Sequence, residues 1–246
     1  MNSRKIKQEV LALLATADRE QIFHEMRQYA EKDLINPLFA ALCRPEDTMR
    51  WHAIDVFGRI LPRLAEQDME AARIVMRRLL WSLNDESGGI GWGAPEAMAE
   101  VMLHHDRLAE EYLHMLLSYL RQDGPLRHQD GNFLELPFLQ RGLLWGIGRL
   151  ASRRAAQLIS RGVVADLLPY LHSEDGEVRG LAVWALSMLA GAAVLPEADR
   201  LRAALLPLTT DSSQVRLYRQ ARIQPVSVAE LVVDALLQIN SAPSSY

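Results

Sequence analysis

Apolar residues recur at steps of three and four positions along almost the whole chain, a spacing typical of amphipathic helices rather than strands. The clearest stretches are 6–14, 71–83, 108–120 and 178–189. Short runs rich in Gly, Pro, Asn, Asp and Ser separate such stretches, for example at 84–89 and 123–125, and residues of these types break helices. The pattern therefore predicts an all-α protein made of helices joined by short breaks.

One apolar frame returns five times in this pattern, starting at residues 49, 90, 139, 178 and 228. Its positions 1, 5, 8, 9 and 12 lie on one helical face and are apolar or small in each copy. In the fourth copy they are Val178, Ala182, Ala185, Leu186 and Leu189. A single pair of helices cannot bury such a face alone, so neighbouring pairs must stack.

The fourth copy is the clearest unit, running from Asp166 to Leu186 as a short helix, a turn that contains Asp175, and a second helix that starts near Val178-Arg179. This unit resembles the HEAT repeat and its PBS-lyase-type relatives. The resemblance implies an α-α superhelix, a solenoid of about five HEAT-like helical hairpins, in which each second helix lines the concave surface. We expect one domain over residues 1–246, with 1–30 as a helical cap. The repeats are expected at 31–66, 68–104, 106–152, 153–190 and 197–240.

A second face of the frame, at positions 3, 7 and 11, carries four of the five tryptophans. Aromatic and arginine side chains are the usual anchors of binding surfaces, so this face is the candidate concave binding stripe. The alternative is that the tryptophans only fill space between stacked helices. The stripe is defined by Trp51, Asp55, Trp92, Glu96, Arg141, Trp145, Arg149 and Trp184.

Three expanded turns join first helices to second helices, and insertions of this kind emerge on one edge of a solenoid. Alternation of apolar and polar residues in the third turn also predicts a small β-hairpin near 213–227. This loop edge either contributes partner contacts or packs together through ordinary ion pairs. We expect no resident metal there, although its acids and histidine leave a metal site open. The loop edge is defined by Asp85, Glu86, His128, Asp130, Arg216 and Tyr218.

Composition places the chain among ordinary globular proteins. It has 246 residues, 49% of them hydrophobic, and 27 basic against 31 acidic side chains give a net charge of −4. Cys43 is the single cysteine, which excludes a disulfide scaffold. No apolar run reaches the ~18 residues of a membrane span, and the first ten residues lack the apolar core of a secretory signal. These features predict a cytoplasmic protein without membrane contact.

No catalytic motif of high specificity is present, so we expect a non-catalytic protein–protein interaction module that binds a protein partner on its concave face and needs no cofactor. Two alternatives stay open. HEAT-like alkylpurine DNA glycosylases use tryptophan, aspartate and arginine on the concave face, and the stripe has all three residue types. Against nucleic acid stands the net negative charge, because phosphate binding needs a basic patch. A small-ligand or lyase-type role, as in phycobilin lyases, rests on the shared repeat alone.

Overall fold

The computed structural model describes residues 3–15, 18–84, 91–125 and 131–241. Contacts within the chain gather in two compact units, Met1–Leu113 and His114–Tyr246, and each is described here by itself. The expectation that residues 1–246 form one domain therefore stays a prediction.

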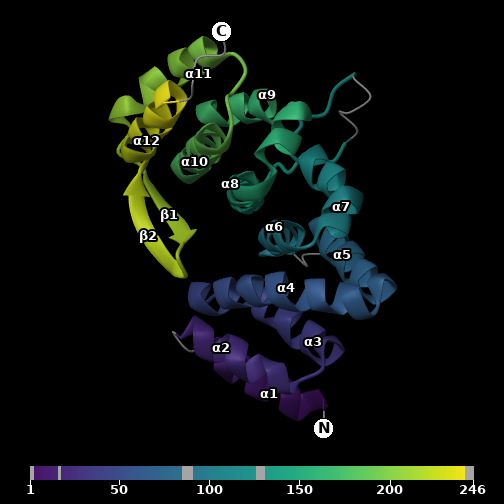
Figure 1. Cartoon of the computed structure of the whole chain (residues 1–246). Helices are drawn as coiled ribbons and strands as arrows, with labels where there is room; N and C mark the ends of the chain where they lie inside the picture. Colours follow the sequence, from purple (N-terminus) through teal and green to yellow (C-terminus); the bar gives the residue numbers. More distant parts are fainter. Residues whose placement is uncertain (1–2, 16–17, 85–90, 126–130, 242–246) are drawn as a thin grey trace. The chain divides into compact units, whose positions relative to one another are not determined.

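The described part of the N-terminal unit is helical (Figure 1). The long helix α4 is its centre and packs against α3, α5 and α6, while α1 covers α3. Aspartates start two of the helices, because the side chains of Asp18 and Asp68 accept hydrogen bonds from backbone N–H groups of the first turns of α2 and α5. The elements are α1 (Ser3–Leu14), α2 (Arg19–Glu25), the 3₁₀ turn η1 (Met26–Gln28), α3 (Glu31–Leu42), α4 (Asp47–Gln67), α5 (Met69–Leu83), α6 (Ala94–His104) and most of α7 (Asp106–Ser118).

The C-terminal unit is built around three second helices in a row, because α10 packs against α8 on one side and α12 on the other. Its first helices are short, and each passes into a 3₁₀ turn at a proline, Pro169 or Pro207. The elements are α8 (Pro137–Ser160), α9 (Val163–Leu167), η2 (Leu168–His172), α10 (Gly176–Ala192), α11 (Ala198–Leu205), η3 (Leu206–Thr210), β1 (Gln214–Arg219), β2 (Arg222–Ser227) and α12 (Val228–Ser241).

Four copies of the repeat frame fall within α4, α8, α10 and α12, and the copy that starts at residue 90 falls on α6 from Ala94 onward, with Trp92 in the turn before that helix. The apolar positions of the frame form the core. In α10 all five are buried, and Phe57 of α4 and Ile147 of α8 are fully buried in the same way. The all-α class and the architecture of repeated helical hairpins are thus established. The expected repeat boundary at residue 153 lies next to a kink at Arg154 (φ −129°, ψ 22°), where two helical segments meet within α8. The repeat bounds stay predictions.

Ion pairs join successive repeats in the C-terminal unit. Arg141 of α8 reaches Asp175, which lies in the turn before α10, with an Nη2–Oδ2 distance of 2.5 Å. Arg179 of α10 reaches Asp211, which lies in the turn after η3, with an Nη2–Oδ2 distance of 2.7 Å. Asp175 also accepts a hydrogen bond from the backbone N–H of Val178 and so caps α10. Each arginine therefore ties its own helix to the turn of the next repeat.

The expected hairpin is present, with β1 and β2 paired antiparallel from Gln214–Ser227 to Arg219–Arg222. In Figure 1 the two strands extend from the start of α12, with β1 on the side of α10. The edge of β2 offers little to another strand, because Pro225 lacks an N–H and the N–H of Ser227 donates to Glu230. The hairpin is therefore not a site for strand addition along Pro225 to Ser227.

Glycines on the inner helices make room for this hairpin. A Cβ on Gly180 would lie 2.2 Å from Val215 Cγ2, and a Cβ on Gly176 would lie 2.4 Å from Ser213 Cβ. The hairpin backbone is held as well, because the N–H of Arg216 donates to Glu177 Oε1 at 2.9 Å. The close approach of β1 to α10 thus depends on helical positions without a side chain.

No helix in the described ranges is long and apolar enough to cross a membrane.

We expect Gly180→Ala to lower the free energy of unfolding by about 1–3 kcal/mol, because the added methyl meets the stiff side chain of Val215. Gly191→Ala in the same helix is the matched control. Its Cβ would lie 3.2 Å from the end of the flexible Gln238 side chain, so helix propensity should keep stability equal or raise it by up to ~1 kcal/mol. Chemical unfolding followed by circular dichroism measures both changes. Equal effects of the two substitutions would show that the hairpin does not need the glycine.

Candidate functional site

The N-terminal half of the stripe is mostly covered. Trp51 is only 9% exposed, whereas Trp92 is 40% exposed, with the Arg50 guanidinium 5.6 Å from the centre of its ring. Asp55 lies 3.7 Å from Arg19, measured from Oδ2 to Nη1. Of these stripe residues, Trp92 is therefore the aromatic side chain that a partner can reach.

Glu96 is a buried acid in the first turn of α6, where it is 8% exposed. Within the described residues, its Oε2 is a fully buried oxygen that has no hydrogen-bond partner. Burial raises the pKa of this carboxyl to about 7, against the smaller opposing effects of its own backbone N–H and of Arg50. The group is thus largely protonated below neutral pH, which avoids the cost of an unpaired buried charge.

The C-terminal half of the stripe is occupied by the chain itself. Trp145 and Trp184 are 3% and 8% exposed and stack on each other, with ring centres 6.4 Å apart. The indole N–H of Trp145 donates to the carbonyl of Tyr218 in β1 at 2.9 Å, and Gly148 leaves room for the Trp184 ring. These two tryptophans therefore have the packing role that was the alternative to partner binding.

The arginines of this half differ in their surroundings. Arg141 forms ion pairs with Asp175 and with Glu177, whose Oε2 lies 2.5 Å from Arg141 Nη1. These ion pairs link α8 to the next repeat. Arg149 is partly exposed. A role of the stripe in partner binding stays a prediction, and its side chains that are at least partly exposed include Trp92, Arg141 and Arg149.

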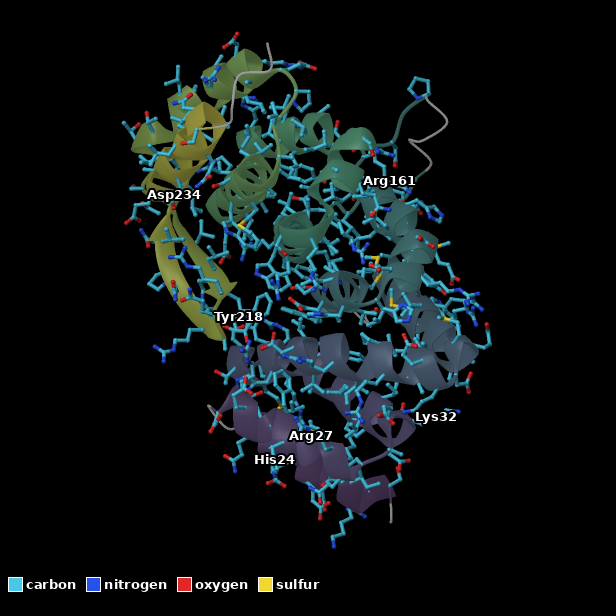
Figure 2. The ribbon with its side chains drawn as sticks, in the orientation of Figure 1. His24, Arg27, Lys32, Arg161, Tyr218 and Asp234 are labelled. Atoms are coloured by element: carbon cyan, nitrogen blue, oxygen red, sulfur yellow. The ribbon has the colours of Figure 1, made fainter. Side chains whose placement is uncertain are left out.

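The loop edge is described only in part. Asp85, Glu86, His128 and Asp130 lie outside the described residues. Arg216 and Tyr218 lie on β1, where the Tyr218 side chain is 6% exposed and packs 6.3 Å from the Trp145 ring centre, as measured between centroids (Tyr218 is labelled in Figure 2). The structure thus joins Tyr218 of the loop edge to Trp145 of the stripe. Within the described part of the chain, no group of three or more His, Cys, Asp or Glu residues is placed to hold a metal ion.

The structure also shows a groove that the sequence analysis missed. This N-terminal groove has a volume of about 370 Å³ and lies between α2–η1, α4 and the end of α6. Its basic side chains come from all three elements, and Phe23 forms part of its wall. Figure 2 labels one of them, Arg27, beside α2. The groove is lined by the aromatic side chain of Phe23 and by the basic side chains of Arg27, Arg59, Arg63 and His104.

Two cations of the N-terminal groove are not neutralised by acids. Across the described ranges, Arg27 and Arg59 have no acidic partner, and the Arg59 guanidinium lies 4.9 Å from the centre of the Phe23 ring. Arg63 pairs with Glu31 at 2.7 Å, and His104 lies 3.5 Å from Glu100. Arg59 occupies position 11 of the first frame copy, which is the one signal in the sequence that pointed here.

Comparisons with known proteins agree on the fold and leave the family open. No family model matches the chain. A protein of Archaeoglobus fulgidus described as uncharacterized is 32% identical over 83 residues, which are 34% of this chain and 42% of that protein, so the match spans less than half of the relative.

Solved structures match over almost the whole chain at low sequence identity. Two engineered proteins, 17% and 16% identical, each match 98% of this chain and 98% and 100% of their own, with TM-scores of 0.51 and 0.52. This likeness concerns the fold alone. A designed armadillo repeat protein, 16% identical over 94% of this chain and 99% of its own, has a TM-score of 0.46, too low to argue from. With frame copies packed as α4 and α6 in one unit and as α8, α10 and α12 in the other, the chain is a helical-repeat protein of the all-α solenoid class.

We expect Trp145→Ala to lower the free energy of unfolding by about 3–5 kcal/mol, because it empties a packed site and removes the hydrogen bond to Tyr218. Trp92→Ala should cost less than about 1 kcal/mol, since its ring is 40% exposed. Thermal unfolding of both variants checks the difference. Similar melting temperatures would contradict the packing role of Trp145.

We expect Glu96→Gln to stabilise the protein increasingly as the pH rises. The pKa of Glu96 is raised from 4.5 to about 7 in the folded protein, so the folded state binds a proton that the unfolded state has lost. The bound proton contributes roughly 3 kcal/mol to the free energy of unfolding below pH 4.5. This contribution falls as the pH rises and is lost above pH 7. Unfolding at pH 5 and pH 8 should therefore give a small and a large gain for the variant. The exposed Glu20→Gln is the control, and a gain for Glu96→Gln that is equal at both pH values would refute a buried, titrating Glu96.

Proposed function

We propose that the chain is a HEAT-like, non-catalytic binding scaffold, and that its N-terminal groove receives an acidic segment of a protein partner. The observation that carries the proposal is that Arg27 and Arg59, in a groove with an aromatic wall, have no acidic partner among the residues that the structure describes. The HEAT-like assignment is supported by the turn acid Asp175 and by Arg179, which donates to backbone carbonyls of the same turn.

Charge selects the occupant. The groove is lined by three arginines and one histidine, and Glu20 is the acid that lines it among the described residues. Arg27 and Arg59 can donate hydrogen bonds to the carboxylates of a partner without first breaking an ion pair with another described acid. Guanidinium groups bind carboxylates through two parallel hydrogen bonds, which favours acidic side chains as ligands.

The apolar wall indicates a peptide as the carrier of these carboxylates. Phe23 lines the groove together with the basic side chains, and Met26, Val56 and Ile60 line its buried part. A groove of about 370 Å³ lies in the ordinary range of about 300–1,000 Å³ for ligand sites, and its mixture of apolar and basic groups suits apolar and acidic residues in alternation. In this proposal, Trp92 and Arg149 of the stripe are secondary contacts of the partner.

The test uses the full chain and a fluorescein-labelled peptide, Ser-Glu-Glu-Leu-Asp-Glu-Leu-Ser, followed by fluorescence anisotropy. A second peptide carries Gln and Asn in place of Glu and Asp. We expect the acidic peptide to bind and to weaken with added salt, and the neutral peptide to bind at least about tenfold more weakly. Arg27→Glu and Arg59→Glu should each weaken the acidic peptide by about fivefold or more.

Arg44→Glu is the matched control, because Arg44 is exposed in the same unit and does not line the groove. Equal loss with Arg44→Glu and Arg59→Glu would reduce the effect to net charge and overturn the proposed site. A single-stranded oligonucleotide of the same charge is tested in parallel. If it binds more tightly than the peptide and loses binding with Arg27→Glu and Arg59→Glu, the groove is a phosphate site and the peptide function is wrong.

A further inference from the structure

The C-terminal unit has a cavity of its own, which shares no lining residue with the N-terminal groove or with the stripe. This C-terminal cavity has a volume of about 390 Å³. Three segments enclose it: the residues just after α7, the approach to α8 with its first turn, and the α9–η2 segment. Its lining includes Arg121, Phe133, Gln140, Asp166, Tyr170 and Ser173.

One hydrogen bond between the segments and one within the approach to α8 hold the walls of this cavity in place. The Tyr170 hydroxyl donates to the carbonyl of Leu120 at 2.9 Å, and Gln140 Nε2 donates to the carbonyl of Leu134 at 2.7 Å. Burial, and secondly the charge of Asp166, raise the pKa of Tyr170, so its hydroxyl keeps the proton that it donates. When the walls of a cavity are already ordered, ligand binding does not carry the entropic cost of ordering them.

Arg121 and Asp166 pair with each other in the wall of the C-terminal cavity, which His172 also lines. Arg121 Nε lies 3.0 Å from Asp166 Oδ2, and Arg121 Nη2 donates to the carbonyl of Arg161 at 2.9 Å. Both side chains are less than one-fifth exposed. An anion would be attracted by Arg121 but repelled by Asp166. The cavity therefore favours a neutral ligand, in contrast to the N-terminal groove.

Size and wall chemistry narrow the ligand further. Phe133 and Tyr170 lie side by side, with ring centres 6.4 Å apart, and form an aromatic wall. The amides of Gln122 and Gln140 and the hydroxyl of Ser173 supply polar groups. A dry cavity of about 150 Å³ takes benzene, so about 390 Å³ has room for a molecule of one or two rings with a polar substituent.

We propose that the C-terminal cavity binds a neutral aromatic small molecule of one or two rings that carries an amide-like hydrogen-bonding group. The ring stacks on the wall formed by Phe133 and Tyr170, and the polar group meets the amides and the Ser173 hydroxyl. This site is independent of the proposed partner groove.

The experiment uses three matched pairs of probes: benzamide and benzoate, nicotinamide and nicotinate, and indole-3-carboxamide and indole-3-carboxylate. Binding to the full chain is measured by ligand-observed NMR titration. We expect at least one carboxamide to bind with a Kd below about 1 mM and its carboxylate to bind about tenfold more weakly. Absence of binding by all three carboxamides, or equal binding of the carboxylates, overturns the proposal.

Variants locate the bound probe. Ala165→Phe fills the cavity from an exposed position on α9 and should abolish binding, and Phe133→Ala should weaken it about tenfold. Ala203→Phe on α11 is the matched control, because Ala203 is also exposed in this unit but does not line the cavity. Unchanged binding by Ala165→Phe of verified fold would place the probe elsewhere and refute the site.

Discussion

The stacking of the C-terminal repeats depends on arginines that pair with an acid in the turn of the following repeat. Arg141 with Asp175 and Arg179 with Asp211 are such pairs, and both acids keep pKa values below their ordinary range although burial opposes this. Asp211 is also tied to the start of α12, since its carbonyl accepts a hydrogen bond from the N–H of Ala229. These pairs therefore fix both the stacking of the helices and the two ends of the hairpin between them.

The hairpin in turn decides which inner surfaces remain open. In the C-terminal unit β1 covers Trp145 and enters the space left by Gly180, so side chains that the repeat frame directs inward meet the chain itself. In the N-terminal unit, Arg59 at position 11 of the frame in α4 lines a groove. β1 thus covers the inner surface at Trp145 in the C-terminal unit, whereas Arg59 lines an open groove in the N-terminal unit.

Sequence periodicity predicts the parts of this fold that depend on local spacing. The five second helices follow from their buried apolar frame, and the hairpin follows from the alternation around Val215 and Leu217. The docking of the hairpin does not follow, because it depends on glycines in α10 whose missing side chains matter only once the strand is placed. The groove was missed for a similar reason: Phe23 and Arg59 are far apart in sequence, and residues 1–30 looked like a cap without chemistry.

Net charge proved a poor guide to local chemistry. The overall charge of −4 argues against nucleic acid as a partner, yet the N-terminal groove gathers Arg27 of η1, Arg59 and Arg63 of α4, and His104 of α6. At physiological ionic strength, charges more than about 8 Å apart are largely screened, so a ligand responds to the side chains that line its site rather than to the sum over the chain. The paired Arg121 and Asp166 show the reverse case, since charged residues there leave a site without net charge. The charge of the ligand that each site favours therefore depends on whether its arginines form ion pairs with neighbouring acids.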